Sequence, residues 1–401
     1  MRTTAEHFVA FGAGLATVLV VAYILYRPRV QRSSAYQATV VPLANIMDVG
    51  FILFAPAIVL LAGFRAPLFM LGICLVAIAA GFAIAYNIRH YEPIAGQGGA
   101  PDGFEEASEW ALLGASMVNI AYYTIVLIAL VMLPFGSTDP TVRGWVGAAV
   151  LVVVIAVGVG GGMDWLNRQG DRTTAFNLAA VLGIVAAFVV FNVQDLIGGR
   201  WDIGESTTMG TDDIRKMIGL FAIVQGFEAS RYIGVRFGSE LRVTTMRVAQ
   251  VISAAVFVVF VLALLAAFLP PIGVADGAAI LEAADDVGGA PLPWLLLLAA
   301  IGSQTSAIIG ATSSRSDMLV ERKVPRRWSF PIILVPAVLM VLFVDLNVAV
   351  NLASRVFAAF FTIQASLALL LAYRNRRWPA MGGFGVVVAA MLAVLVFGLP
   401  L

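Results

Sequence analysis

Charged side chains interrupt an otherwise apolar stretch, residues 222–238, which reads AIVQGFEASRYIGVRFG. Glu228 and Arg231 lie there between Gly226 and Gly234. A charge at the centre of a bilayer costs roughly 2.5–3.5 kcal/mol on insertion scales, and glycine weakens a helix. Because broken helices inside membranes usually line a binding cavity, this stretch predicts a functional site.

Glu228 allows two interpretations. It lies three residues before Arg231, so on a continuous helix the two side chains would share a face and could neutralise each other. Alternatively, Glu228 is a gating or proton-linked carboxylate beside unwound backbone, with Gly226 and Phe227 next to it in a binding site.

A second carboxylate, Asp48, lies in another apolar segment, close to Asn45 and Gly50. Glycine loosens the helical ladder and frees carbonyl groups that can coordinate a cation. Asp48 therefore predicts a site for a cation, a proton or an ammonium group, and we expect it to contact cargo more directly than a self-neutralised glutamate would. The alternative is a structural ion pair with Arg231 or Arg315.

Hydroxyl groups are concentrated in residues 302–317, which read GSQTSAIIGATSSRSD. Thr312, Ser313 and Ser314 can supply hard oxygen ligands for a small cation such as sodium. Hydroxyls in a helix can equally bond back to the preceding turn or let helices pack closely. Arg315 follows directly, and its charge could stand in for a bound sodium ion or repel one.

Asn119, Tyr122 and Tyr123 form a polar and aromatic group in the segment 106–134. Buried amides and phenols need partners, and aromatic faces suit organic substrates or cations. These residues are candidates for a pocket wall, with helix packing as the alternative. Four further charges are interpreted as gating or structural: Arg231, Arg315, Asp317 and Arg355.

Composition indicates an integral membrane protein. Of the 401 residues, 61% are hydrophobic and 12% are charged, and the mean hydropathy is +0.94. Long apolar runs recur along the chain, and each can span a bilayer as a helix. The prediction is an all-α polytopic membrane protein with about twelve transmembrane helices, at residues 7–26, 38–63, 66–88, 106–134, 141–161, 173–193, 213–236, 243–269, 292–320, 328–344, 347–373 and 379–399.

Several function classes are not expected. A net charge of +1 provides no basic field for nucleic acid. No glycine-rich phosphate loop, HExxH sequence or histidine-based nucleophile pair occurs, so we expect no enzyme. We also expect no cofactor, apart from Na⁺ or H⁺ as a coupling ion.

The loop charges predict an orientation. Cytoplasmic loops are enriched in Lys and Arg, and with twelve spans the four basic clusters fall on one side, which places both termini outside. The loop 89–105 is assigned to the basic side although it is mostly acidic. The four clusters are at residues 27–32, 236–247, 322–327 and 374–377.

Two motifs resemble a known transporter family. GFEASRYIG (226–234) looks like the sixth core helix of the amino acid–polyamine–organocation (APC) superfamily, where a GFE-like break often lies at the substrate. GATSSRS (310–316) resembles the eighth core helix of LeuT-fold symporters, where hydroxyls help to form a sodium site. Counting spans back from the first motif makes the Asp48 segment the first core helix.

This resemblance implies a LeuT-like fold of two inverted five-helix repeats, 38–193 and 213–373. A peripheral helix and basic loop, 1–37, precede them, and a helix at 379–401 follows. The usual GxG of the first core helix is replaced by DVG at 48–50, and the motifs of divalent-metal carriers are missing, so metal transport is less expected.

The resemblance also implies a function. We expect a secondary active transporter of a small amino acid, amine or related organic solute, working by alternating access in a bacterial cytoplasmic membrane. Sodium, if used, would bind at Thr312 and Ser313. The alternative is a non-transporting subunit or sensor that keeps the fold. Partners would be the solute and the bilayer, with a homo-oligomer or a membrane partner also open.

Overall fold

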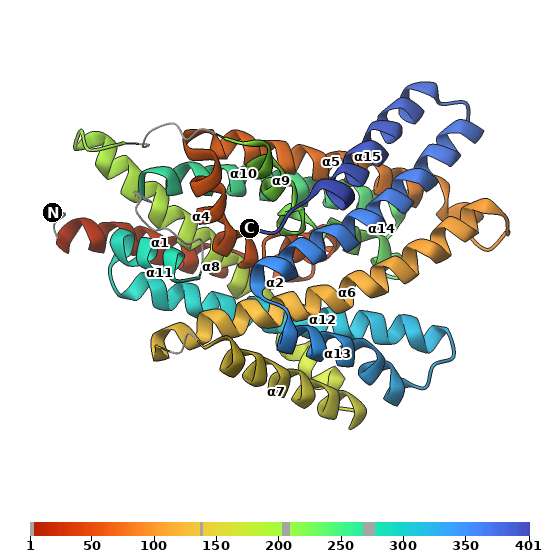
Figure 1. Cartoon of the computed structure of the whole chain (residues 1–401), viewed down its shortest axis with the longest axis horizontal. Helices are drawn as coiled ribbons and strands as arrows, with labels where there is room; N and C mark the ends of the chain where they lie inside the picture. Colours follow the sequence, from red (N-terminus) through yellow and green to blue (C-terminus); the bar gives the residue numbers. More distant parts are fainter. Residues whose placement is uncertain (1–3, 137–138, 203–208, 268–276) are drawn as a thin grey trace.

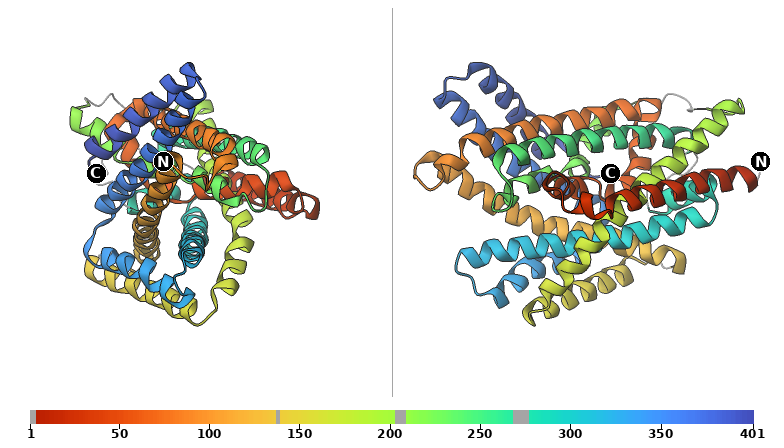
Figure 2. Two further views of the ribbon diagram at one scale, coloured as in Figure 1. Left: turned by 90° about the vertical axis from the view of Figure 1, so that its right-hand side faces the viewer. Right: turned by 180° about the vertical axis from the view of Figure 1, so that it is seen from behind.

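The described residues are mostly helical (Figure 1), and no strand occurs among them. Long helices run roughly along the longest axis of the molecule and pack side by side, as the rotated views also show (Figure 2). The computed structural model describes residues 4–136, 139–202, 209–267 and 277–401.

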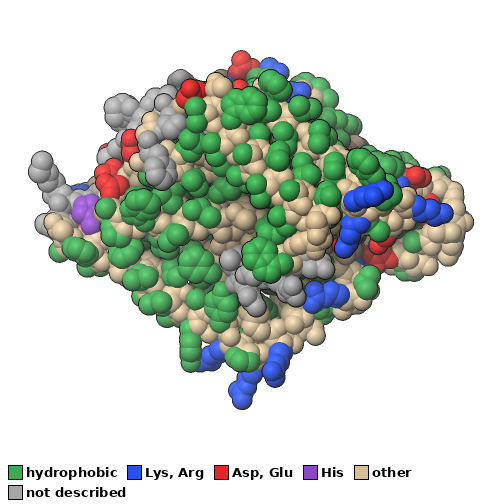
Figure 3. All heavy atoms as spheres, turned by 90° about the horizontal axis from the view of Figure 1, so that it is seen from below, with side chains coloured by type: hydrophobic (Ala, Val, Ile, Leu, Met, Phe, Trp, Pro, Cys, Tyr) green, Lys and Arg blue, Asp and Glu red, His purple; other side chains and the backbone are tan. Residues whose placement is uncertain are grey.

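Ten helical stretches in the described part of the chain are long and apolar enough to cross a bilayer, which confirms the predicted all-α polytopic class. Apolar side chains cover the middle of the face in Figure 3, and charged ones gather toward its margins. The stretches are α1 (Thr4–Leu25), α4 with α5 (Gly50–Ile94), α6 (Ala100–Met132), α7 (Pro140–Val159), residues 174–197 of α8 (Met163–Ile197), α10 (Ser239–Ala267), α12 (Pro291–Glu321), α13 (Arg326–Phe343), α14 (Leu346–Arg374) and α15 (Trp378–Phe397).

Two of the twelve predicted segments are not single helices. The segment 38–63 is divided into α3 (Ser34–Ile46) and α4 (Gly50–Ala62), and residues 47–49 between them are not helical. The segment 213–236 consists of α9 (Thr211–Ile218) and two short 3-10 helices, η4 (Phe221–Val224) and η5 (Phe227–Ile233).

The remaining predicted segments each coincide with one long helix, and short helices lie between the long ones. One of the long helices, α5 (Ala66–His90), follows α4 after the short η1 (Gly63–Arg65). The other short helices are α2 (Pro28–Gln31), η2 (Glu92–Ile94), η3 (Leu133–Phe135) and α11 (Gly277–Gly288).

Ion pairs join helix ends and connecting segments at each end of the bundle. At one end, Glu92 in the acidic loop 89–105 pairs with Arg242 at 2.5 Å, and Arg322 pairs with Glu109. At the other end, Arg200 pairs with Glu6 at 2.6 Å, so the start of α1 lies beside the loop after α8. The acidic loop thus shares the end that carries the basic loops, which is the side assigned to it from the loop count.

Helices from the two predicted halves pack in reciprocal pairs. α5 packs against α10, and α7 packs against α13. α6 packs against both α12 and α14, and α12 packs in turn against α8. If the predicted core helices are numbered along the chain, exchanging the first five with the last five maps these named pairs onto one another. The division into domains itself stays a prediction.

Candidate functional site

The two interruptions of the helices meet in the interior of the protein. Gly226 has φ +119°, a left-handed conformation that favours glycine. A Cβ atom at this position would lie 2.6 Å from the carbonyl carbon of Asn45 and 2.8 Å from its Cβ. The backbone of the second break therefore packs directly on the end of α3, just before the first break, and α3 also packs along η5.

Each break contains a nearly buried carboxylate that holds the loosened backbone. The Gly50 N–H donates to Asp48, and the Gly226 N–H donates to Glu228 at 2.8 Å. In both cases the carboxylate and the amide are two residues apart. Asp48 is 8% exposed and Glu228 is 7% exposed. Neither makes an ion pair within the part of the chain described, so the alternative of a structural pair for Asp48 is not supported.

The predicted aromatic group lies on α6 and faces the first break. A Cβ atom on Gly50 would collide with the Tyr122 hydroxyl and with an oxygen of Asp48, so only glycine fits here. Tyr123 interacts with Asp48 and with Asn119, and it accepts a hydrogen bond from Gln225 at 3.5 Å. The Tyr122 hydroxyl and the Asn119 carbonyl oxygen are buried without a partner among the described residues. The wall thus keeps unused hydrogen-bonding capacity.

A cavity of about 810 Å³ lies against both breaks and reaches toward the basic end, where Tyr26, Gln31 and Arg236 line it. In this conformation Glu228 lines the cavity and Asp48 does not. From the sequence, Asp48 was expected to be the carboxylate that contacts the solute more directly. Of the predicted site residues, seven line the cavity and the others do not: the seven are Asn45, Asn119, Tyr123, Gly226, Glu228, Ser314 and Arg315.

Asp48, Gly50 and Tyr122 form a layer behind this lining, where the Tyr122 ring lies 6.1 Å from that of Phe54. Phe227 packs away from the cavity and stacks on Phe361, with 4.9 Å between ring centroids. Phe227 therefore anchors the second break on α14.

Arg231 does not pair with Glu228, so that interpretation was wrong. Its guanidinium donates to Glu105 at 2.7 Å and also to the Gln364 side chain, and it lies 5.4 Å from the centroid of the Tyr91 ring. The two side chains have different partners instead: Glu228 accepts from the Gly226 N–H, and Arg231 pairs with Glu105 on α6. Glu105 was not predicted as its partner; it lies on α6, at the end of the segment 89–105 that the sequence had assigned to an acidic loop.

Gln364 completes this buried network. Its amide donates to Glu105 at 3.0 Å and to Ser108 at 2.7 Å, while its carbonyl accepts from Asn87 at 2.7 Å. The network joins α5, α6, η5 and α14. Arg231 and Glu105 are both paired within it, as a structural group of buried charges requires, while the side-chain oxygen of Asn87 has no partner among the described residues.

Arg315 lines the cavity and is a buried cation there, whereas Arg236 is exposed at its basic end. Arg315 donates to the Ser314 hydroxyl at 3.2 Å and lies 5.2 Å from the centroid of the Tyr232 ring. It interacts electrostatically with Glu228. Its Nε is buried and has no partner within the described chain. Arg315 therefore has a donor left for a ligand.

The remaining predicted charges lie away from the cavity. Asp317 forms an exposed pair with Arg326. Arg355 donates to the Gly398 carbonyl at 2.7 Å, which fastens the end of α15. Both contacts are structural.

The hydroxyls of α12 divide into two groups. Thr312 donates to the Ile308 carbonyl at 2.7 Å, the ordinary bond to the preceding turn. Ser303, which was not singled out, accepts from the Val49 N–H at 3.4 Å and so contacts the first break. Thr312 lies nine residues further along α12, about 14 Å at 1.5 Å per residue. The sodium site at Thr312 and Ser313 stays a prediction.

Comparison with known proteins establishes the family. Residues 28–398 match a sequence family described as APC superfamily transporter. The chain therefore belongs to that family and is an integral membrane protein. It is also 25% identical over 397 residues to an uncharacterized protein of Aquifex aeolicus (strain VF5), a match that covers 95% of this chain and 96% of the Aquifex protein.

Proposed function

We propose that the protein is a secondary active transporter of a small amino acid, amine or related organic solute. The observation that carries this proposal is the meeting of two helix breaks against a cavity of about 810 Å³, each break with a carboxylate that makes no ion pair among the described residues. Drug-sized ligands occupy pockets of about 300–1,000 Å³. Broken helices at such a cavity provide polar backbone to a solute inside the membrane.

The charges in the cavity suggest how the solute is oriented. An ammonium group suits Glu228, with Tyr123 and Asn119 beside it. The Gly50 and Gly226 N–H groups already bind the carboxylates of their own breaks. A substrate carboxylate would therefore use Arg315, whose Nε is free in the described structure. A zwitterion or an amine fits this arrangement better than a neutral sugar does.

The same geometry supports alternating access. The cavity reaches the end that carries the basic loops, which would be the cytoplasmic side under the positive-inside rule, and this conformation would then be inward-facing. The reciprocal helix packing supports a LeuT-like 5+5 inverted repeat, whose halves would rock about the two breaks. Each break provides a hinge that a continuous helix would lack.

Protons are the coupling ion that this site favours. Arg315 lies close to the hydroxyls that would hold sodium, and its charge opposes a second cation there. Asp48 and Glu228 are carboxylates in the membrane, where each needs a cation or a proton. Exchange of a proton for a substrate ammonium group at these carboxylates would couple the two fluxes.

Counterflow in proteoliposomes tests the proposal. Vesicles preloaded with single amino acids or amines should accumulate the labelled solute when the solute is a substrate, and a pH gradient should drive net uptake more than a sodium gradient. Asp48→Asn should abolish coupled uptake while leaving the thermal unfolding of the purified protein unchanged. Absence of counterflow with every amino acid and amine would favour the non-transporting subunit, and normal coupled uptake by Asp48→Asn would remove its assigned role.

A further inference from the structure

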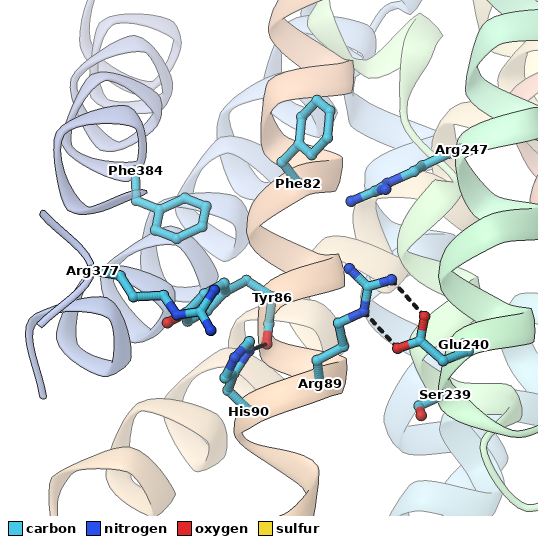
Figure 4. Close-up of a pocket in the computed structure, with 9 residues that line it drawn as sticks. All are labelled: Phe82, Tyr86, Arg89, His90, Ser239, Glu240, Arg247, Arg377 and Phe384. Atoms are coloured by element: carbon cyan, nitrogen blue, oxygen red, sulfur yellow. Dashed lines mark hydrogen bonds and ion pairs between the residues drawn. The ribbon is translucent and has the colours of Figure 1, made fainter. Parts of the chain in front are cut away.

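A second cavity, of about 450 Å³, lies at the basic end between α5, the start of α10 and the start of α15 (Figure 4). It is separate from the central cavity, since the two share no lining residue. Its lining is cationic and aromatic, and it consists of Phe82, Tyr86, Arg89, His90, Ser239, Glu240, Arg247, Arg377 and Phe384.

The cavity carries an excess of positive charge. Arg89 is neutralised by Glu240, with two hydrogen bonds of 2.7 and 2.6 Å (Figure 4). Arg247 and Arg377 make no ion pair in the described chain, and the Nε of Arg247 is buried there without a partner. Three arginines and one glutamate leave a net charge of +2, which is an environment for an anion.

Aromatic rings fix the shape of this cavity. Tyr86 stacks on His90 with 3.9 Å between ring centroids, and Phe384 meets Tyr86 edge-on at 5.1 Å. The Arg247 guanidinium lies 4.9 Å from the centroid of the Phe82 ring, which holds it toward the space between α5 and α10. Arg247 on α10 and Arg377, directly before α15, thus come from different segments and face a preformed space.

The position of the cavity indicates an amphipathic ligand, with one polar and one apolar part. Trp378, next to Arg377, and Tyr373 are both more than half exposed, and their rings lie 6.0 Å apart. Exposed Trp and Tyr mark the membrane–water interface. An exposed apolar stripe of α5 begins at the cavity and runs toward the bilayer centre. It is formed by Phe82, Leu75, Leu71 and Leu68.

We propose that this cavity binds the phosphate headgroup of an anionic phospholipid, with the acyl chains lying along the exposed stripe of α5. Arg247 and Arg377 bind the phosphate oxygens, and the Phe384–Tyr86–His90 stack supports the glycerol region. Basic pockets between membrane helices recognise anionic lipids in this way. A free phosphate ion would use the arginines but leave the apolar stripe without a function.

Lipid retention measures this site directly. The protein is placed in nanodiscs that contain equal amounts of dioleoylphosphatidylglycerol and dioleoylphosphatidylcholine. Native mass spectrometry should then show that it retains phosphatidylglycerol preferentially. Arg247→Gln or Arg377→Gln should each weaken this retention about fivefold, because a basic residue near an anionic surface contributes about 1 kcal/mol. Arg374→Gln, in the same basic cluster but outside the cavity lining, should leave retention unchanged.

Three results would overturn the proposal. One is retention of both lipids by the wild type in the proportion supplied, a measurement that needs no variant to fold. Another is an equal loss of retention in Arg374→Gln, which would indicate general surface charge. The third is stabilisation of the wild type by inorganic phosphate as strong as that by phosphatidylglycerol, which would assign the cavity to a soluble anion.

Discussion

Glu228 and Arg231 are three residues apart on η5, yet they lie in two different electrostatic environments. Arg231 is enclosed by Glu105, Gln364 and the Tyr91 ring, which together satisfy its charge. Glu228 accepts a backbone N–H and faces a cavity. Both side chains are almost fully buried, so burial does not distinguish a structural charge from a functional one. The distinction lies in whether the chain itself supplies the partner.

Removing Arg231 should have the largest effect on stability. Arg231→Met leaves Glu105 buried without its cation, which we expect to cost about 3–5 kcal/mol of unfolding free energy, as in other broken buried pairs. Thermal unfolding of the detergent-purified protein measures the loss. Arg236→Met, an exposed arginine at the mouth of the cavity, should cost no more than about 1 kcal/mol. Equal stability of the two variants would contradict the assigned structural role.

The second break depends on one glycine. Gly226→Ala forces a side chain into a left-handed backbone and against Asn45, so we expect a loss of about 1–3 kcal/mol in unfolding free energy. Gly310→Ala is the matched control, because Gly310 also lines the cavity but has open space around its Cβ position. If the two variants unfold at the same temperature, the contact between the breaks is not tight.

The smallest effect concerns the hydroxyls of α12. Ser303→Ala removes a bond to the first break and should cost about 1 kcal/mol. Thr312→Val removes only a bond within α12, so its cost should be smaller. Thermal unfolding with and without sodium separates these roles. A sodium-dependent stabilisation that Thr312→Val abolishes and Ser303→Ala preserves would support the sodium site predicted at Thr312.

Local sequence was sufficient to predict where the helices break. The glycines next to Asp48 and Glu228 weaken the helix at positions where a carboxylate can hold the free amide, and both breaks occur there. The charge at Arg231 was also recognised. Its partner was not, because Glu105 is 126 residues away in the chain and comes near only through the tertiary packing that places α6 against α14.

The same limit explains why the hydroxyl pattern of α12 favoured Thr312 over Ser303. A cluster of hydroxyls is visible in the sequence, but the turn of the helix that faces the first break is fixed by how α12 packs against α6 and α8. Likewise, Glu228 lines the cavity and Asp48 does not, which depends on the position of Tyr123 between the two breaks.

Glu228 is thus assigned to solute binding, and Arg231 to stabilising the fold. Counterflow of a stabilising amino acid or amine by Glu228→Gln tests this assignment most directly, because glutamine keeps the shape of the side chain and removes only its charge. Uptake by Glu228→Gln should fall about 10- to 100-fold, the equivalent of one charge-assisted hydrogen bond, while the unfolding temperature stays that of the wild type. Wild-type counterflow by Glu228→Gln would contradict the assignment.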